Sequence, residues 1–251
     1  MKRVPIAEPW MKEILPRGWP TGTSTVLTGA GRSGKPLIGQ IVAANWLRQG
    51  GSVVFMSLQY PNHEFVVEGL RRVAGLEVAD HAGRVAFIGL DAEMEGMAVE
   101  SPGRIRANLV KPQIWDEALE AAWKSVPAEG PGILIFGSAL NLLLFSPTYS
   151  DAILERMKRA LSAHEDRTIL FALSTTAKAQ QIVELEDLAD NLLISHSTRN
   201  PFRLFVRVVR MKGVRFRPDP VEIPLSPETL AEVTAVADRS RRRVLSLISD
   251  L

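Results

Sequence analysis

The sequence contains no cysteine, which excludes disulfide frameworks, thiolate metal sites and cysteine nucleophiles and fits a cytoplasmic location. Aromatic residues make up only 6% of the chain. The formal net charge is only +2, so the overall charge does not indicate binding to nucleic acid. The 251 residues are nevertheless 46% hydrophobic, which is enough to bury a sizeable core. We therefore expect a globular protein built on one large domain.

Long apolar runs are also missing. Residues 1–20 contain several prolines and no apolar run of signal-peptide length, so we do not expect secretion. The longest apolar stretch, Ile133–Phe145, is interrupted by glycine, serine and asparagine and falls short of the roughly 20 residues of a membrane-spanning helix. We expect a buried core element there and no membrane span.

Short apolar segments alternate with helical patterns, which is typical of an α/β protein with a mainly parallel central sheet flanked by helices. Residues 203–210 and 221–223 are extended in character and predict an antiparallel C-terminal hairpin. The least patterned region, residues 91–112, predicts a functional or mobile loop. The expected strands are Ser24–Thr28, Ser52–Ser57, Val85–Gly89, Ile133–Phe136 and Thr168–Leu173, and the expected helices are Leu37–Leu47, Asn62–Ala74, Ile114–Lys124 and Asp151–His164.

Residues 226–251 are expected to form a helical tail on a main domain of residues 1–225. Ser226 and Pro227 form a good helix start, with a hydroxyl cap followed by proline at the first helical position. The arginine cluster Arg239–Arg243 then precedes several apolar residues, the pattern of a short basic amphipathic helix. Such a helix packs on its own domain or contacts a partner protein, anionic lipid or nucleic acid, and the pattern leaves these alternatives open.

The most informative segment is the glycine-rich turn Gly29–Pro36, which follows a predicted strand and opens a predicted helix. It matches both the G-x-G-x-x-G dinucleotide fingerprint and the G-x-x-x-x-G-K phosphate-binding loop, or P-loop. A dinucleotide site needs an acid at the end of the next strand, and Phe55–Gln59 has none. The P-loop is therefore favoured, with the nucleotide-binding residues Gly29, Ala30, Gly31, Arg32, Ser33, Gly34, Lys35 and Pro36.

This P-loop departs from its pattern at Pro36. The position after the lysine normally carries a serine or threonine whose hydroxyl binds Mg²⁺, and proline has neither that hydroxyl nor an amide proton. Lys35 and the remaining amides could still hold a phosphate. The alternative is a turn kept for its shape, with nothing bound.

Further segments extend the pattern on both sides of the loop. In their order and spacing they resemble the KaiC-like branch of the RecA-fold ATPases, which includes RadA-type paralogues. The resemblance implies a RecA-like P-loop NTPase fold, ATP or ADP as ligand, and assembly as a homo-oligomer or with another RecA-like subunit. The segments that carry it are Leu15–Gly22 leading into Val26–Gly29, then Gly50–Leu58, Leu188–Leu193 and Arg207–Gly213.

The chain departs from the family pattern at the positions that serve catalysis and Mg²⁺ binding in the family. Where the family has a catalytic glutamate pair, this chain has Gln59 and Tyr60, and an amide cannot take a proton from the attacking water. Where the family has the aspartate that supports Mg²⁺, the chain has Gly137 and Ser138. We therefore do not expect ATP hydrolysis by the standard mechanism, and the ligand expected is ATP or ADP without tightly bound Mg²⁺.

The resemblance also implies that Arg210 and Lys212 contact nucleotide bound by a neighbouring subunit. Lysine and arginine are exchanged relative to the family, which keeps the charge but alters the geometry offered to a phosphate. Basic residues on a solvated hairpin are the alternative.

Other polar groups give weaker indications. The histidines at positions 63, 81, 164 and 196 lack metal-ligand spacing, so we expect no metal site. Ser174–Thr176 ends a predicted strand where α/β proteins bind ligands, and a polar loop is the alternative.

The leading hypothesis is a pseudo-ATPase with a KaiC-like RecA fold that acts as a regulatory or scaffolding subunit and retains weak nucleotide or anion binding. One alternative is a RecA/RadA paralogue that binds DNA through loops and the basic tail. Another is an ATPase whose site is completed by a partner subunit.

Overall fold

The computed structural model describes residues 2–58, 63–163, 167–225, 242 and 244–249. Its strands are β1 (Arg3–Val4), β2 (Trp19–Pro20), β3 (Ser24–Thr28), β4 (Ser52–Ser57), β5 (Val85–Leu90), β6 (Met97–Ser101), β7 (Arg104–Ala107), β8 (Ile133–Ser138), β9 (Thr168–Ala172), β10 (Asn191–Arg199), β11 (Phe202–Arg210) and β12 (Val221–Ile223). β1 and β2 form a small separate sheet.

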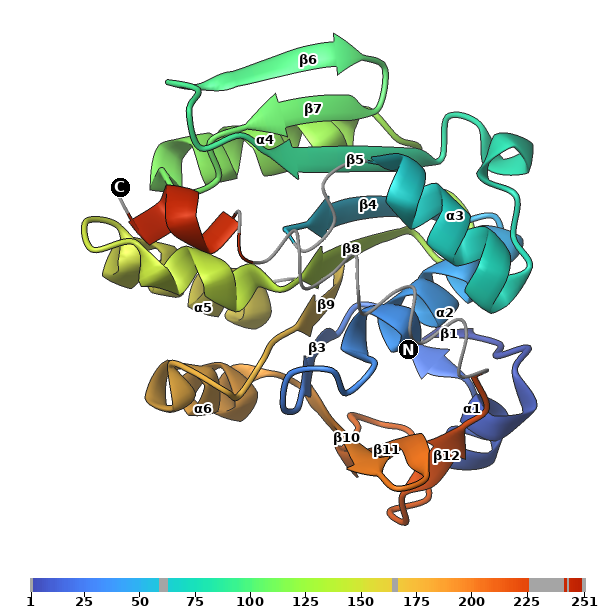
Figure 1. The fold of residues 1–251 in the computed structure, drawn as a ribbon. Helices are drawn as coiled ribbons and strands as arrows, with labels where there is room; N and C mark the ends of the chain where they lie inside the picture. The colour runs from blue at the N-terminus through green and yellow to red at the C-terminus, as the bar shows by residue number, and fades with distance from the viewer. Residues whose placement is uncertain (1, 59–62, 164–166, 226–241, 243, 250–251) are drawn as a thin grey trace.

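The other strands form one ten-stranded sheet in the order β12-β11-β10-β3-β9-β8-β4-β5-β7-β6 (Figure 1). The pairs from β10 to β7 are parallel. The two margins are antiparallel, with β10, β11 and β12 at one side and β7 and β6 at the other. The predicted α/β class, with a mainly parallel sheet and an antiparallel C-terminal hairpin, is confirmed.

Helices lie on both faces of this sheet (Figure 1). Their bounds are α1 (Pro9–Ile14), α2 (Lys35–Arg48), α3 (His63–Ala74), α4 (Pro112–Lys124), α5 (Ser150–Ser162) and α6 (Ala179–Leu188), with 3-10 turns at Val78–His81 and Leu140–Phe145. Among the described residues, no helix has the length and apolar character needed to cross a membrane.

The core is divided into two layers by the sheet. Alternate side chains of β8 point to opposite faces, so that Phe136 joins the α1, α2 and α3 layer and Ile135 joins the α4 and α5 layer. α2 packs very close to the sheet at Gly39. A Cβ on this residue would lie 2.0 Å from the Phe136 ring, so the close approach requires glycine. This central helix therefore holds the turn that precedes it close to the ends of the parallel strands.

The structure contains elements that the sequence-based prediction lacks, among them α1 and the β1 and β2 pair. The expected loop at residues 91–112 is wrong, because β6 and β7 form an antiparallel pair within it and β7 continues the parallel sheet from β5. The residues before this pair are tied down by Asn108, whose amide donates to the carbonyls of Ala92 (3.1 Å) and Met94 (2.9 Å). α6 was not predicted at all.

The described part of the C-terminal segment is helical at residues 242 and 244–249. Ile248 is fully buried in the α4 and α5 layer, whereas Arg242 is exposed. Ser226, Pro227 and the other arginines of the 239–243 cluster lie outside the described residues. The division of the chain into residues 1–225 and 226–251 stays a prediction.

Candidate nucleotide-binding site

The glycine-rich turn lies where the sequence predicts it, between the carboxyl end of β3 and the start of α2. Its backbone has positive φ at Gly29 (147°), Arg32 (62°) and Gly34 (75°), and Gly34 is the N-cap of α2. Such angles are accessible to glycine at little cost. The turn therefore has the strand, loop and helix arrangement that can direct backbone N–H groups toward a phosphate.

Lys35 holds this loop from inside. Its side chain is only 6% exposed, and its Nζ donates to the carbonyl oxygens of Gly29 (2.8 Å) and Ala30 (2.6 Å) and to the Ser33 hydroxyl (3.0 Å). A buried ammonium group requires such partners because burial removes its hydration. The three contacts match the three protons that the ammonium can donate.

β10 closes one side of the loop through Ser195. The hydroxyls of Ser33 and Ser195 lie 2.7 Å apart, and Ser195 donates to the Thr28 carbonyl at 3.2 Å. A Cβ on Gly29 would lie 2.1 Å from the Ser195 carbonyl oxygen, so this close approach requires glycine. Sequence analysis missed Ser195, and no local motif marks it.

The segment after β9 closes the other side. The Gly31 amide donates to the Thr176 hydroxyl (3.0 Å), and the Thr175 amide donates to the Gly29 carbonyl (3.0 Å). Ser174–Thr176, which the sequence places at a ligand-binding edge or in a polar loop, is therefore in direct contact with the P-loop.

The positions that would support Mg²⁺ do not fit the ion. Pro36 lies in the first turn of α2 and offers no hydroxyl. A Cβ on Gly137 would lie 2.4 Å from Leu140 Cδ1 and 2.8 Å from Phe171 Cδ1, so apolar side chains fill the space that a carboxylate would need. Mg²⁺ requires oxygen ligands, and neither position can provide one from a side chain.

Ser138 lies at the end of β8, paired in register with Ser57 at the end of β4. Both hydroxyl oxygens are buried and have no hydrogen-bond partner among the described residues. Two uncharged hydroxyls therefore lie near the positions for which the sequence resemblance implies a metal-supporting and a catalytic acid. Gln59 and Tyr60 lie outside the described residues.

Arg210 and Lys212 lie toward the opposite end of β3 from the loop. Arg210 donates to the carbonyls of Glu186 (2.5 Å) and Ala189 (2.8 Å) at the end of α6. Lys212 pairs with Asp190 at 2.8 Å, and Asp190 accepts from the amide of Ser24, the first residue of β3. Within one subunit these two residues are engaged away from the P-loop, and their contact with a neighbouring subunit stays a prediction.

The histidines do not gather. His63 begins α3, with its ring centroid 5.6 Å from that of Phe87, and His196 stacks on Phe205 at 5.0 Å. Burial lowers the pKa of His81, and His164 lies outside the described residues. Within the part of the chain that the structure describes, no group of three histidine, aspartate or glutamate side chains could hold a metal ion.

No protein-family model matches this chain, and no curated protein matches it in sequence. Among solved structures, the chain is similar to a KaiC-like protein from the hyperthermophilic archaeon Pyrococcus horikoshii OT3. The two share 16% sequence identity with a TM-score of 0.65, over 90% of this chain and 96% of the other. The chain therefore has a KaiC-like RecA fold.

Proposed function

We propose that this protein is a nucleotide-binding regulatory or scaffolding subunit that does not hydrolyse ATP. The observation that carries the proposal is the contrast within one site: the Lys35 loop keeps its P-loop geometry, whereas Leu140 and Phe171 fill the space beside Gly137. Phosphoryl transfer depends on metal charge neutralisation and a positioned nucleophile. A site that lacks the metal-supporting groups retains only the means to bind.

Binding in this site uses the loop amides, the positive end of α2 and the Lys35 ammonium. In the structure Lys35 already donates to three oxygen atoms. A bound phosphate must therefore replace at least one of these bonds, which offsets part of the binding free energy. We infer weak binding that does not depend on Mg²⁺.

Calorimetric titration of ATP into the full chain, with and without Mg²⁺, tests this proposal. We expect similar dissociation constants in the two titrations and loss of binding in Lys35→Ala. Lys124→Ala is the matched control, because Lys124 lies on the surface of α4 with its side chain 72% exposed. Mg²⁺-dependent hydrolysis that Lys35→Ala abolishes would refute the inactive assignment, and failure of the wild type to bind ATP would remove nucleotide as the ligand.

The regulatory or scaffolding role requires a partner, for which we propose a second copy or another RecA-like subunit. The KaiC-like fold supports this assignment. Light scattering with and without ATP measures the assembly, and a monomer under both conditions contradicts self-association. Hydrolysis that appears only in mixtures with a RecA-like partner would instead identify an ATPase completed in trans.

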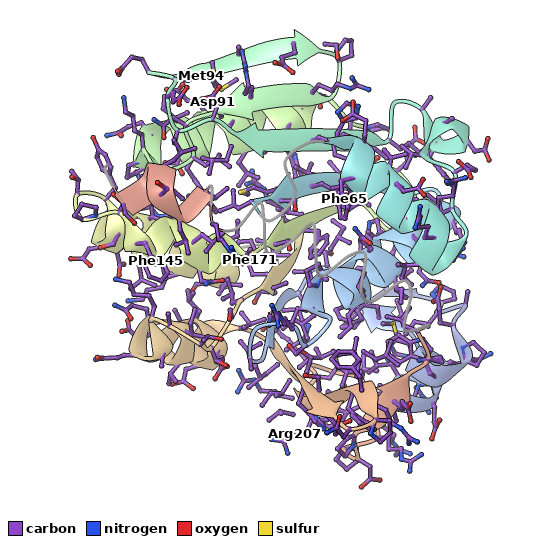
Figure 2. All side chains as sticks on the ribbon, viewed as in Figure 1. Phe65, Asp91, Met94, Phe145, Phe171 and Arg207 are labelled. Atoms are coloured by element: carbon purple, nitrogen blue, oxygen red, sulfur yellow. The ribbon has the colours of Figure 1, made fainter. Side chains whose placement is uncertain are left out.

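A second candidate function is binding of single-stranded nucleic acid on the outer face of β10 and β11. His196 and Phe205 stack with an interplanar angle of 11°, and aromatic faces of this kind can stack on bases. Arg207 lies on β11, the strand of Phe205, and is exposed; Figure 2 shows it projecting from the hairpin. It has no ion-pair partner among the described residues.

Fluorescence anisotropy with a labelled oligonucleotide tests this candidate. Affinity should fall steeply with salt and should be reduced by Phe205→Ala and by Arg207→Gln. Absence of binding at low salt removes it.

A further inference from the structure

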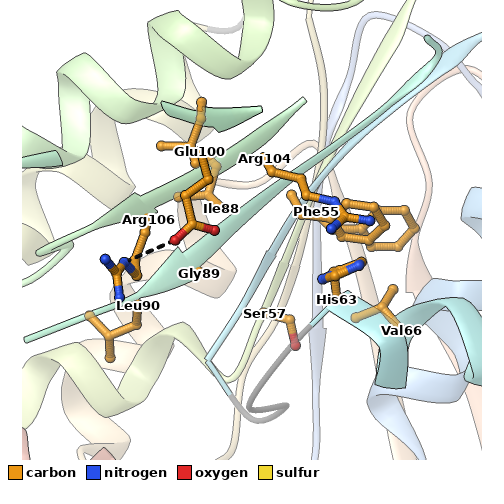
Figure 3. Close-up of a pocket in the computed structure, with 12 residues that line it drawn as sticks. Phe55, Ser57, His63, Val66, Ile88, Gly89, Leu90, Glu100, Arg104 and Arg106 are labelled. Atoms are coloured by element: carbon orange, nitrogen blue, oxygen red, sulfur yellow. Dashed lines mark ion pairs between the residues drawn. The ribbon is translucent and has the colours of Figure 1, made fainter. Parts of the chain in front are cut away.

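A second pocket lies on the α3 side of the sheet, apart from the P-loop (Figure 3). It has a volume of about 170 Å³ and is formed by β4, β5, the β6 and β7 pair and the start of α3. None of the residues of the glycine-rich turn lines it. The pocket is therefore separate from the phosphate-binding loop, although Ser57 at the end of β4 lies between the two regions.

Two arginines from β7 line the pocket, and they differ in their partners. Arg106 is neutralised by Glu100 at 3.2 Å and by Asp91 at 3.4 Å. Arg104 has no ion pair or hydrogen bond to a described residue. The pocket therefore has at its edge an exposed guanidinium group that no described residue pairs with.

Ser57 provides a second polar group. It lies at the carboxyl end of β4 and lines the pocket, and its buried hydroxyl has no partner among the described residues. The surrounding protein covers this oxygen, so Ser57 adds polar character to the wall without offering an accessible donor. Figure 3 shows the head group of Arg104 beside His63, whereas Ser57 lies farther along the pocket with its oxygen directed away from Arg104.

The remaining walls determine the size and character of an occupant. Gly89, next to the carboxyl end of β5, leaves the strand without a side chain there, and a built Cβ would meet only the Ile105 carbonyl, at 3.9 Å. Phe87 and Val66 provide apolar surface beside this opening. The His63 ring lies against Phe87, while its Nε2 is 3.2 Å from Glu64.

We propose that this pocket binds a small ligand through an oxyanion, a carboxylate or phosphate group, that pairs with Arg104. Arginine binds both anions with parallel N–H donors, and the exposed Arg104 has these donors available. The apolar wall accommodates a compact hydrocarbon or aromatic body next to the anion. A pocket with a few convergent polar groups in an apolar lining is the usual form of a small-molecule site.

Benzoate and inorganic phosphate are suitable probes, titrated calorimetrically into the full chain and into Lys35→Ala, which removes phosphate binding at the P-loop. We expect at least one probe to bind the Lys35→Ala protein as it binds the wild type. Stronger binding of benzoate identifies a carboxylate ligand, and stronger binding of phosphate identifies a phosphorylated one. Arg104→Gln should weaken that binding at least about tenfold, the loss expected for a charged hydrogen-bond pair.

Two further variants keep the test decisive. Arg159→Gln makes the same charge change at an exposed arginine of α5 and should leave the affinity within about twofold, because surface charges away from the pocket are screened. Gly89→Val fills the open space without removing a polar group, and should abolish binding while the circular dichroism spectrum stays unchanged. The proposal is overturned if neither probe binds, or if binding survives both Arg104→Gln and Gly89→Val.

Discussion

The loop after β3 and the end of β8, the two halves of the proposed site, differ in the groups that surround them. Around the loop, Lys35, Ser33 and Ser195 form a connected set of short polar contacts. Around Gly137, the neighbouring groups are the hydrocarbon of Leu140 and the ring of Phe171. The loop thus has polar surroundings, whereas the position at Gly137 is packed with apolar groups. The two regions can differ in this way because they are built on different strands.

The largest expected effect comes from restoring the acid with Gly137→Asp. Its Cβ would overlap Leu140 and Phe171, and its carboxylate would be buried among apolar groups, so we expect a loss of about 3–5 kcal/mol in the free energy of unfolding. Urea denaturation measures this loss, and an ATPase assay should show no gain of activity.

This variant also has a predicted pH dependence. Burial would raise the pKa of the introduced carboxyl above its unfolded value, so the destabilisation should shrink as the pH falls and the group becomes protonated. If Gly137→Asp instead folds with wild-type stability and hydrolyses ATP, Leu140 and Phe171 do not exclude a carboxylate from this position.

The next effect is that of Gly29→Ala on the loop side. A Cβ would lie 2.1 Å from the Ser195 carbonyl oxygen, which forces β10 and the loop apart, and we expect a loss of about 2–3 kcal/mol. Gly83→Ala is the matched control, because Gly83 also has positive φ but has nothing within 4 Å of a built Cβ. It should cost only about 1 kcal/mol. Equal losses in the two variants would show that Ser195 does not restrict the loop.

Ser195→Ala should have a smaller effect, because it removes the hydroxyl between Ser33 and the Thr28 carbonyl without changing the backbone. We expect a loss of about 1 kcal/mol in thermal or urea unfolding, the usual net contribution of a hydrogen bond. Ser195→Ala should lower the affinity for ATP by less than Lys35→Ala does. A larger change in affinity than in stability would assign Ser195 a direct part in binding.

The smallest expected effect is that of Thr176→Val, which removes the acceptor of the Gly31 amide on the exposed side of the loop. Water can replace an exposed partner, so the loss in unfolding free energy should stay below about 0.5 kcal/mol. The difference between the losses of unfolding free energy in Thr176→Val and Ser195→Ala measures how much more the Ser195 side stabilises the loop. A loss larger than that of Ser195→Ala would reverse this order.

Local patterns explain most of what could be predicted. The P-loop is recognisable because its glycines and lysine lie within eight consecutive residues, and the buried strands are nearly continuous apolar runs. The β6 and β7 pair was missed because β6 is half exposed along its length and lacks a clear alternation of buried residues. α6 was missed because it has only ten residues and buries just Ile182 and Leu185.

The sequence by itself determined the mainly parallel α/β architecture, the glycine-rich turn and the absence of a hydroxyl at Pro36 and of a carboxylate at Gly137, because these are properties of residue type and short-range spacing. Only the tertiary structure decided that Ser195, 162 residues from Ser33, closes the loop, and that Leu140 and Phe171 fill the place of the missing acid. It also brought Arg104 and Ser57 to one pocket. Such contacts depend on which strands become neighbours, and strand order is set by the packing of the whole sheet.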